Sequence, residues 1–271
     1  MQRFFIEPDS VVGGKIVIRG NDVNHMKHAL RMKVGEQVEV CDSAGLVYLC
    51  YIEDYVDAKP VLKKNRVEDK DGDKGKGNRV EHQELLAILT IEKQWFNDTE
   101  LSSKIYLFQA LPKSEKMELI IQKAVELGVY EIIPVLTNRV VVKLDGRKSP
   151  KKVSRWNVIS ESAAKQSGRG FIPRVRDVMS FEEGLDFSKE MDVVLCPYEL
   201  AEDMNKTKEI IKGIQAGQKI GVFIGPEGGF EKGEVEKAIR VGALPMTLGK
   251  RILRTETAAI TALAMLMYEL E

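Results

Sequence analysis

From Lys104 onward, short apolar runs alternate with amphipathic stretches in which apolar residues recur at helical spacing. Ser114–Leu127 is the clearest amphipathic stretch, which Gly128 can end in a left-handed conformation, and a second begins near Glu231. Strands that alternate with helices form a mostly parallel sheet covered by helices. This part of the chain is therefore predicted to be an α/β domain. Its predicted strands are Ile105–Ala110, Ile132–Leu136, Val193–Cys196, Ile220–Ile224 and Pro245–Leu248.

The first third of the sequence is instead rich in β-like runs, interrupted by one short helical stretch at Asn24–Met32. Residues 65–82 are dominated by charged residues and glycine, which cannot bury a core, so we predict a flexible loop there. The β-rich pattern and the pattern of alternating strands and helices meet near residues 94–103. This change predicts two domains, residues 1–98 and residues 99–271. The predicted strands of the first domain are Lys15–Arg19, Gln37–Cys41, Val47–Ile52 and Glu84–Ile91.

Composition argues against several classes of protein. Hydrophobic residues make up 44% and charged residues 30%, as in soluble globular proteins, and no apolar stretch approaches membrane-spanning length. The first residues lack the long apolar region of a signal peptide. The 3 cysteines lack the spacing of zinc ligands, and there are only 3 histidines. We expect a cytoplasmic protein without a metal centre or a membrane partner.

Charge is segregated although the formal net charge is zero. Between Arg139 and Arg176 basic residues are frequent, and only Asp145 and Glu161 oppose them. Such a field can steer a polyanion such as RNA onto one face of a protein. A solvated helix face would carry the same residues, so the charge pattern alone leaves both interpretations open.

Two glycine-bearing loops follow the last two predicted strands: Gly225-Pro-Glu-Gly-Gly229 and Leu248-Gly-Lys-Arg-Ile-Leu253. Ligands of α/β proteins bind outside the carboxyl ends of parallel strands, and glycine lets the backbone approach them closely. Neither a phosphate-binding P-loop motif nor a Rossmann glycine motif is present. We therefore predict a cofactor pocket that is built mainly from backbone groups.

The segments Ile224–Phe230 and Leu248–Ala258 resemble the SPOUT class of S-adenosylmethionine-dependent RNA methyltransferases. Upstream, Gln109–Glu118, Gln122–Val129 and Ala163–Arg169 resemble one family of that class, the bacterial enzymes that methylate N3 of a specific uridine in 16S rRNA. In addition, Arg3-Phe-Phe and His25–Gly35 are similar to the PUA-like RNA-binding domain of that family. The resemblance covers nearly the whole chain outside the charged loop.

The resemblance implies a parallel sheet tied into a trefoil knot in the C-terminal domain and a PUA- or OB-like β-barrel in the N-terminal domain. It further implies S-adenosylmethionine (SAM) as cofactor, 16S rRNA in the small ribosomal subunit as substrate, and a homodimer. The wide apolar stripe of the last helix, which begins near Thr257, is compatible with a subunit interface and also with a buried helix in a monomer.

Backbone groups and apolar walls near the two loops can hold an adenine and a ribose without dedicated side chains. Simple turn chemistry is the alternative for the glycines, and their clustering favours the cofactor. The predicted cofactor-binding residues are Leu195, Ile224, Gly225, Glu227, Gly228, Leu248, Gly249, Ile252 and Leu253.

Arg254 is the predicted catalytic residue, because it lies between the second loop and the last helix. Loss of the N3 proton spreads negative charge onto the uracil oxygens, which a guanidinium can stabilise. The alternative is a structural role, in a salt bridge to Glu256 or at a neighbouring helix end. Glu256 is a weaker candidate for the proton acceptor, since capping of the last helix by Glu256 or Thr255 is the simpler role.

Contacts to RNA phosphates and to the flipped base are predicted from the charge segregation together with the resemblance. The predicted RNA-binding residues are Arg3, Arg31, Arg139, Lys165, Gln166 and Arg169. Two other functions remain open at this point. A different SPOUT activity, ribose 2′-O methylation, would use the same crevice, and a non-catalytic ribosome-assembly factor would have a degenerate pocket.

Overall fold

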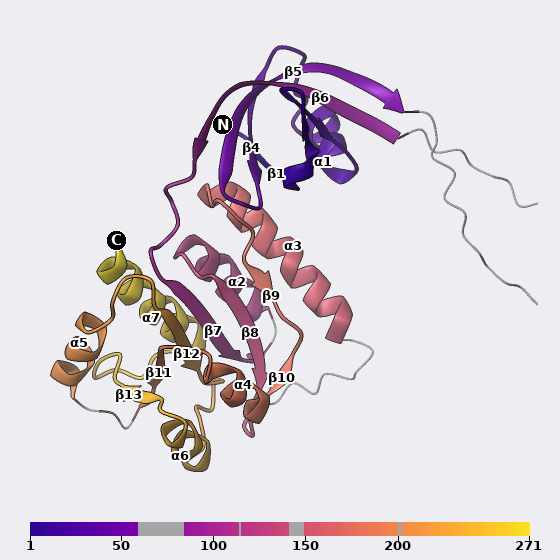
Figure 1. Ribbon diagram of the computed structural model, residues 1–271. Helices are drawn as coiled ribbons and strands as arrows, with labels where there is room; N and C mark the ends of the chain where they lie inside the picture. The colour runs from indigo at the N-terminus through magenta and orange to yellow at the C-terminus, as the bar shows by residue number, and fades with distance from the viewer. Residues whose placement is uncertain (59–83, 114, 141–148, 200, 202) are drawn as a thin grey trace, which may run out of the picture. The chain divides into compact units, whose positions relative to one another are not determined.

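The computed structural model describes residues 1–58, 84–113, 115–140, 149–199, 201 and 203–271 (Figure 1). The charged loop predicted at residues 65–82 lies outside the described residues. The chain forms two compact units, Met1–Phe96 and Asn97–Glu271.

The first unit is a curled six-stranded sheet with the strand order β1-β4-β5-β6-β3-β2. β5 and β6 are its longest strands, and register shifts at Leu49/Cys50 and Ile52/Asp54 bend them (Figure 1). Among the described strands no pairing joins the edges β1 and β2, so the sheet curls without closing into a complete barrel. Its strands are β1 (Arg3–Ile6), β2 (Val11–Val12), β3 (Lys15–Ile18), β4 (Gln37–Asp42), β5 (Leu46–Ala58) and β6 (Glu84–Phe96).

Short helical turns close one face of this sheet, and their buried residues Val23 and Met26 join its core. A 3-10 turn spans Pro8–Ser10, and helix α1 (Asn21–Asn24) continues directly into a π-helical turn at His25–Ala29. The helix predicted at Asn24–Met32 is therefore shifted toward the N-terminus. It ends early because Arg31 adopts a left-handed backbone conformation, with a φ of 54°.

The second unit confirms the predicted α/β fold. Its sheet has the order β10-β8-β7-β12-β11-β13, with β9 beside β8, and all of its strand pairs are parallel. The strands are β7 (Lys104–Ala110), β8 (Glu131–Leu136), β9 (Arg174–Val175), β10 (Met179–Ser180), β11 (Val193–Pro197), β12 (Lys219–Ile224) and β13 (Leu244–Met246). The helices are α2 (Lys116–Glu126), α3 (Ser149–Ser167), α4 (Phe181–Ser188), α5 (Met204–Lys212), α6 (Lys232–Arg240) and α7 (Thr255–Leu270).

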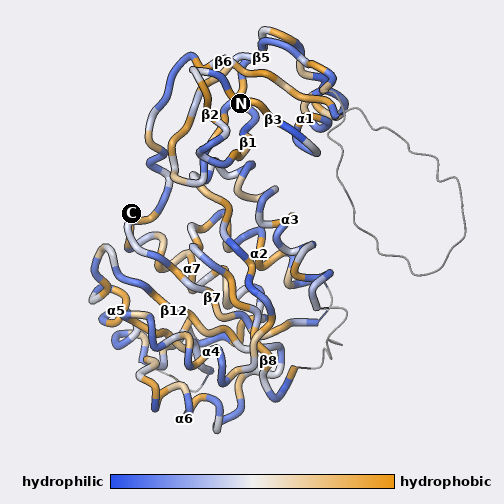
Figure 2. Tube along the Cα trace, turned by 45° about the vertical axis from the view of Figure 1, so that its right-hand side comes forward, coloured by the Kyte–Doolittle hydropathy of each residue, from blue (hydrophilic) through white to orange (hydrophobic). Residues whose placement is uncertain are grey.

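Apolar side chains explain why the central strands of this sheet are buried. β7 and β12 carry almost only apolar residues, which appear as orange segments in Figure 2. Between these two neighbouring strands Phe108 stacks on Phe223, with ring centroids 4.3 Å apart. A β-carbon on Gly221 would lie 3.2 Å from the Phe108 ring, so glycine leaves the room that this stack occupies.

Helix α2 buries one apolar face and ends as the sequence predicts. Gly128 has a φ of 86°, and its N–H donates to the Val125 carbonyl while the Val129 N–H donates to the Ala124 carbonyl. These two hydrogen bonds form a Schellman motif, which satisfies carbonyls at the end of the helix. α2 packs against both α3 and α7.

Sheet order brings three loops to one edge. β11 lies between β12 and β13, so the segments that follow the carboxyl ends of these three parallel strands are neighbours. That edge is where ligands of open α/β sheets bind.

No helix in the described part of the chain is long and apolar enough to cross a bilayer. Across the same residues no group of three or more histidine, cysteine or acidic side chains is arranged to hold a metal ion.

Candidate functional site

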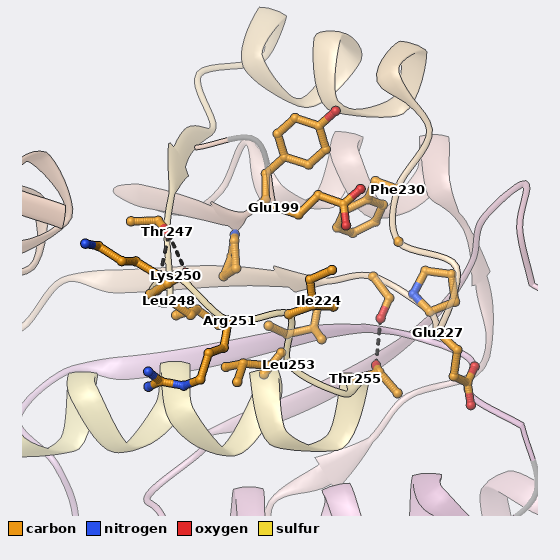
Figure 3. A pocket seen from close by; sticks show the side chains of 18 residues that line it. Glu199, Ile224, Glu227, Phe230, Thr247, Leu248, Lys250, Arg251, Leu253 and Thr255 are labelled. Carbon is orange, nitrogen blue, oxygen red and sulfur yellow. Dashed lines mark hydrogen bonds between the residues drawn. The ribbon is translucent and has the colours of Figure 1, made fainter. Parts of the chain in front are cut away.

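A pocket of about 170 Å³ opens at this edge of the sheet (Figure 3). The ends of β11 and β12, both glycine-bearing loops and the first turn of α7 form its wall. Ile224 and Leu253 lie near the middle of the view and Leu248 lies to the left of them, whereas Lys250 and Arg251 extend outward. The lining residues are Pro197, Tyr198, Glu199, Ile224, Gly225, Pro226, Glu227, Gly229, Phe230, Thr247, Leu248, Gly249, Lys250, Arg251, Ile252, Leu253, Thr255 and Ala258.

The first loop, residues 225–230, is folded tightly on itself. The Gly229 N–H donates to the Pro226 carbonyl over 2.9 Å, which closes a four-residue turn. A β-carbon on Gly225 would lie 3.2 Å from the Phe230 nitrogen and 3.3 Å from its ring. Only glycine therefore lets the chain turn back so closely after β12.

The second loop, residues 247–254, requires glycine for a different reason. Gly249 has a φ of 116°, a conformation that side-chain-bearing residues rarely adopt. Its N–H donates to the Thr247 hydroxyl over 3.2 Å. The Thr247 N–H in turn donates to the Thr207 hydroxyl of α5 over 3.0 Å, which fixes the start of the loop.

Thr255, the first residue of α7, connects the two loops. Its hydroxyl donates to the Gly225 carbonyl over 2.6 Å (Figure 3) and accepts a hydrogen bond from the fully buried Gln109 amide over 3.1 Å. Thr255 was one of two residues predicted to cap α7. Its side chain instead connects β7, the first loop and α7.

Glu256 forms an ion pair with Lys116, the first residue of α2. One carboxylate oxygen lies 3.2 Å from the Lys116 ammonium, and the Glu256 side chain is 14% exposed. The predicted alternative, a salt bridge from Arg254 to Glu256, is not among the ion pairs of the described residues. Arg254 occupies the N-cap position of α7 with an exposed side chain, directly between two pocket residues, Leu253 and Thr255.

Seven of the nine predicted cofactor residues line the pocket: Ile224, Gly225, Glu227, Leu248, Gly249, Ile252 and Leu253. Leu195 does not, because it is buried inside β11, two residues before the strand ends. Gly228 does not either, and its carbonyl accepts a hydrogen bond from Arg139.

Sequence reasoning missed the contribution of β11, the residues Pro197, Tyr198 and Glu199. A usable signal was present, because these residues directly follow the predicted strand Val193–Cys196. The rule that placed the two glycine loops at the carboxyl edge applies equally to this third strand. The segment lacks glycine, and it was overlooked for that reason.

Four of the six predicted RNA-binding residues are wholly or partly accessible, whereas the side chain of Arg3 is only 9% exposed. Arg31 and Gln166 are exposed. Arg3 forms an ion pair with Glu39 at 2.8 Å and Lys165 forms one with Glu161 at 2.7 Å. The Arg139 guanidinium donates to the Gly228 carbonyl over 2.7 Å while its side chain stays 47% exposed.

Arg169 is a correction to this set. Its side chain is 3% exposed, and its guanidinium pairs with the Glu100 carboxylate at 2.6 Å. It also donates to the carbonyls of Val125 and Val129, at the end of α2, over 2.7 Å and 3.0 Å. A guanidinium whose donors are used inside the protein is not presented to a phosphate, so we assign Arg169 to the fold.

Comparison with known proteins agrees with the fold. Residues 99–267 match the RNA methyltransferase domain family, and residues 18–62 match the RNA methyltransferase PUA domain. The ribosomal RNA small subunit methyltransferase E of Bacillus subtilis is 34% identical over 278 aligned residues, which cover 100% of this chain and 98% of the relative.

Two solved structures cover nearly the whole chain. The ribosomal RNA small subunit methyltransferase E of Neisseria gonorrhoeae, bound to S-adenosylmethionine, is 30% identical with a TM-score of 0.74, covering 97% of this chain and 96% of its own. A Legionella pneumophila protein in complex with the cofactor SAM is 28% identical with a TM-score of 0.77, covering 98% and 96%. On the match of its domain and on its identity to full-length relatives, this chain belongs to the RNA methyltransferase family.

Proposed function

We propose that this protein is a SAM-dependent methyltransferase that modifies N3 of a specific uridine in 16S rRNA of the small ribosomal subunit, uracil 1498 in the family. The observation that carries this proposal is the pocket at the carboxyl edge of the sheet, with an exposed guanidinium, Arg254, beside it. Full-length identity to relatives named ribosomal RNA small subunit methyltransferase E supports the choice of substrate.

The pocket residues suit SAM. Ile224, Leu248 and Leu253 provide apolar walls for an adenine ring, and the backbone of both loops provides hydrogen-bonding groups for its edge. Glu199 adds an exposed carboxylate at the rim, suited to accept hydrogen bonds from ribose hydroxyls. When bound, SAM supplies a methyl group that is already activated for transfer.

The remaining chemistry requires little from the chain. Uracil N3 must lose its proton, and the resulting negative charge spreads onto the uracil oxygens. Arg254 lies in the sequence between two pocket residues, Leu253 and Thr255, and we assign its guanidinium the role of holding those oxygens and stabilising the charge as it develops. Positioning of the base next to the pocket supplies most of the remaining rate enhancement.

The two units divide the work in this proposal. We assign RNA binding to the PUA-like domain, residues 1–98, with further contacts from Arg139, Lys165 and Gln166, and methyl transfer to the SPOUT domain, residues 99–271, in which the family's trefoil knot would lie. The protein acts as a cytoplasmic homodimer. Support for a dimer comes from the end of α7, where the apolar residues Met267 and Leu270 stay partly exposed together with Tyr268, which is 84% exposed.

The decisive experiment locates the modified nucleotide. Purified protein is incubated with SAM and small subunits that lack the modification, and the nucleosides of the 16S rRNA are analysed by mass spectrometry. We expect N3-methyluridine at a single position. Methylation of a ribose 2′-oxygen would replace the proposed reaction by the other SPOUT activity. Calorimetry that detects no SAM binding would instead favour a non-catalytic assembly factor.

Replacing Gly249 by valine should weaken SAM binding about tenfold or more, because the left-handed φ of 116° strains any β-branched residue and the loop must rearrange. Calorimetric titration with SAM measures the effect. Gly217→Val is the matched control, since Gly217 has a φ of 90° in a turn that does not line the pocket. Equal loss of SAM binding in both variants would show that strain acts through global stability and not through the pocket.

Charge reversal at Arg31 should weaken RNA binding and lower the salt dependence of the RNA affinity by about one unit of log–log slope. SAM affinity should stay unchanged, because Arg31 lies in the first unit, outside the pocket. Binding of a small-subunit RNA fragment, measured over a series of salt concentrations, tests this. Arg240→Glu on α6 serves as an exposed control. A parallel fall in SAM affinity for Arg31→Glu would reassign Arg31 to folding.

A further inference from the structure

Lys116, the first residue of α2, joins two acidic side chains, one in the first loop of the pocket and one in the first turn of α7. Its ammonium nitrogen lies 3.2 Å from a carboxylate oxygen of Glu227, in the first loop. The same nitrogen lies 3.2 Å from a carboxylate oxygen of Glu256, in the first turn of α7. The three side chains are partly buried, with 31%, 27% and 14% of their surfaces exposed for Lys116, Glu227 and Glu256.

Neighbouring backbone and side-chain groups reinforce this link. The Lys113 N–H donates to the same Glu227 oxygen that faces Lys116, over 3.0 Å. Gln109, at the end of β7, binds Thr255, which binds the Gly225 carbonyl. The stretch from Gln109 to Lys116 therefore holds the first loop and the start of α7 together twice, once by neutral hydrogen bonds and once by charges.

The electrostatics favour a charged bridge at neutral pH. The Glu227 carboxylate, supported further by Glu256, raises the pKa of Lys116 above its ordinary value, although partial burial opposes this. Burial works against the charged form of Glu227, but backbone N–H groups of Glu227 and Lys113 together with Lys116 outweigh it and lower the pKa of that carboxyl. Lys116 and Glu227 therefore stay oppositely charged well to either side of neutrality.

We propose that Lys116 is a positioning residue for methyl transfer: it fixes the first cofactor loop against the start of α7, and thereby sets the pocket wall and Arg254 relative to each other. This inference rests on the proposed function. Lys116 does not line the pocket and acts through Glu227, which does, and through Glu256, two residues from Arg254. Without the ammonium, two carboxylates that share one counter-charge would repel each other and the first loop would move away from α7.

Lys116→Met keeps most of the aliphatic stem and removes the charge. We expect its SAM affinity to fall about tenfold and its kcat to fall as well, because both the pocket wall and the Arg254 position loosen. Its melting temperature should fall by no more than about 4 °C, which corresponds to about 1 kcal/mol, because the partly buried bridge lies outside the apolar core. Lys116→Arg, which preserves the charge, should recover most of the SAM affinity.

Lys123→Met is the matched control. Lys123 also lies on α2 and pairs with Glu126 at 2.8 Å, but neither residue lines the pocket. The same substitution there should leave SAM affinity and kcat unchanged. If Lys116→Met and Lys123→Met behave alike in SAM titration, the bridge is an ordinary surface ion pair and the proposal is overturned.

A double-mutant cycle isolates the bridge from any general effect on folding. Glu256→Gln removes one of the two repelling carboxylates, so in the Lys116→Met background it should restore part of the SAM affinity. Strictly additive losses in SAM affinity would contradict the proposal. Failure of the wild-type protein to bind SAM would instead remove the proposed function itself, so the two failures are distinguishable.

Discussion

Substitution of Arg254 by alanine is expected to lower the rate of methyl transfer about a hundredfold or more while leaving SAM affinity close to that of the wild type. Loss of a single preorganised donor to a developing oxyanion has effects of this size in other enzymes. Single-turnover methylation of small subunits measures the rate of the chemical step, and calorimetry measures SAM binding separately.

The position of Arg254 explains why rate and affinity should separate. Its side chain is exposed and does not line the pocket, whereas its neighbours Leu253 and Thr255 do. Its main chain serves the fold, because the Arg254 carbonyl accepts the Ala258 N–H over 2.8 Å and so begins α7. Alanine keeps this backbone hydrogen bond, so truncation removes the guanidinium without removing the helix start.

Arg254→Lys separates the effect of the positive charge from the effect of the planar guanidinium. Lysine keeps the charge but loses the planar fork of donors, so an intermediate rate is expected. Arg240→Ala, an exposed arginine on α6, should leave the rate unchanged. A wild-type rate for Arg254→Ala would remove its catalytic role. A loss confined to SAM affinity would make Arg254 part of the pocket.

Local sequence patterns were sufficient for the fold of the second unit. The alternation of apolar runs and amphipathic stretches predicted a parallel sheet, and Gly128 predicted the end of α2, because both depend on residues close together in the chain. Gly225 and Gly249 marked the pocket for a similar reason. One is required by close packing of the loop on itself and the other by its positive φ, and both requirements restrict the residue type at that position.

Partners far apart in the sequence could not be predicted in this way. Lys116 and Glu256 are separated by more than half of the chain, and no periodicity connects a residue at the start of α2 with one at the start of α7. Leu195 was placed in the pocket because the exact end of β11 was unknown. Strand ends are the least certain part of any prediction from sequence, and the side chain that faces a ligand changes with each residue.

Arg169 shows that a local charge pattern cannot predict a distant partner either. Its place in a basic run suggested an RNA contact, but its guanidinium is buried against Glu100, 69 residues earlier in the chain. Arg169→Ala is therefore expected to lower the free energy of unfolding by about 3 kcal/mol or more, as in other proteins where one partner of a buried ion pair is removed. The substitution leaves the Glu100 carboxylate without its counter-charge. It also removes the guanidinium donors to the carbonyls of Val125, near the end of α2, and Val129, just beyond it, so among the described residues the Val125 carbonyl keeps only its hydrogen bond from the Gly128 N–H.

Arg155→Ala is the matched control for this prediction, because it removes an exposed arginine from an ion pair. Arg155 pairs with Glu118 at 2.8 Å, nearly as close a contact, but its side chain is 66% exposed, so its loss should change the free energy of unfolding by less than about 1 kcal/mol. Denaturant unfolding of both variants, followed by circular dichroism, measures the difference directly. Similar stabilities would mean that the buried pair contributes no more than the exposed one. Arg169→Ala could instead also weaken RNA binding and reduce its salt dependence. In that case Arg169 would be assigned to the RNA-binding surface again, and its ion pair with Glu100 would have to break when RNA binds.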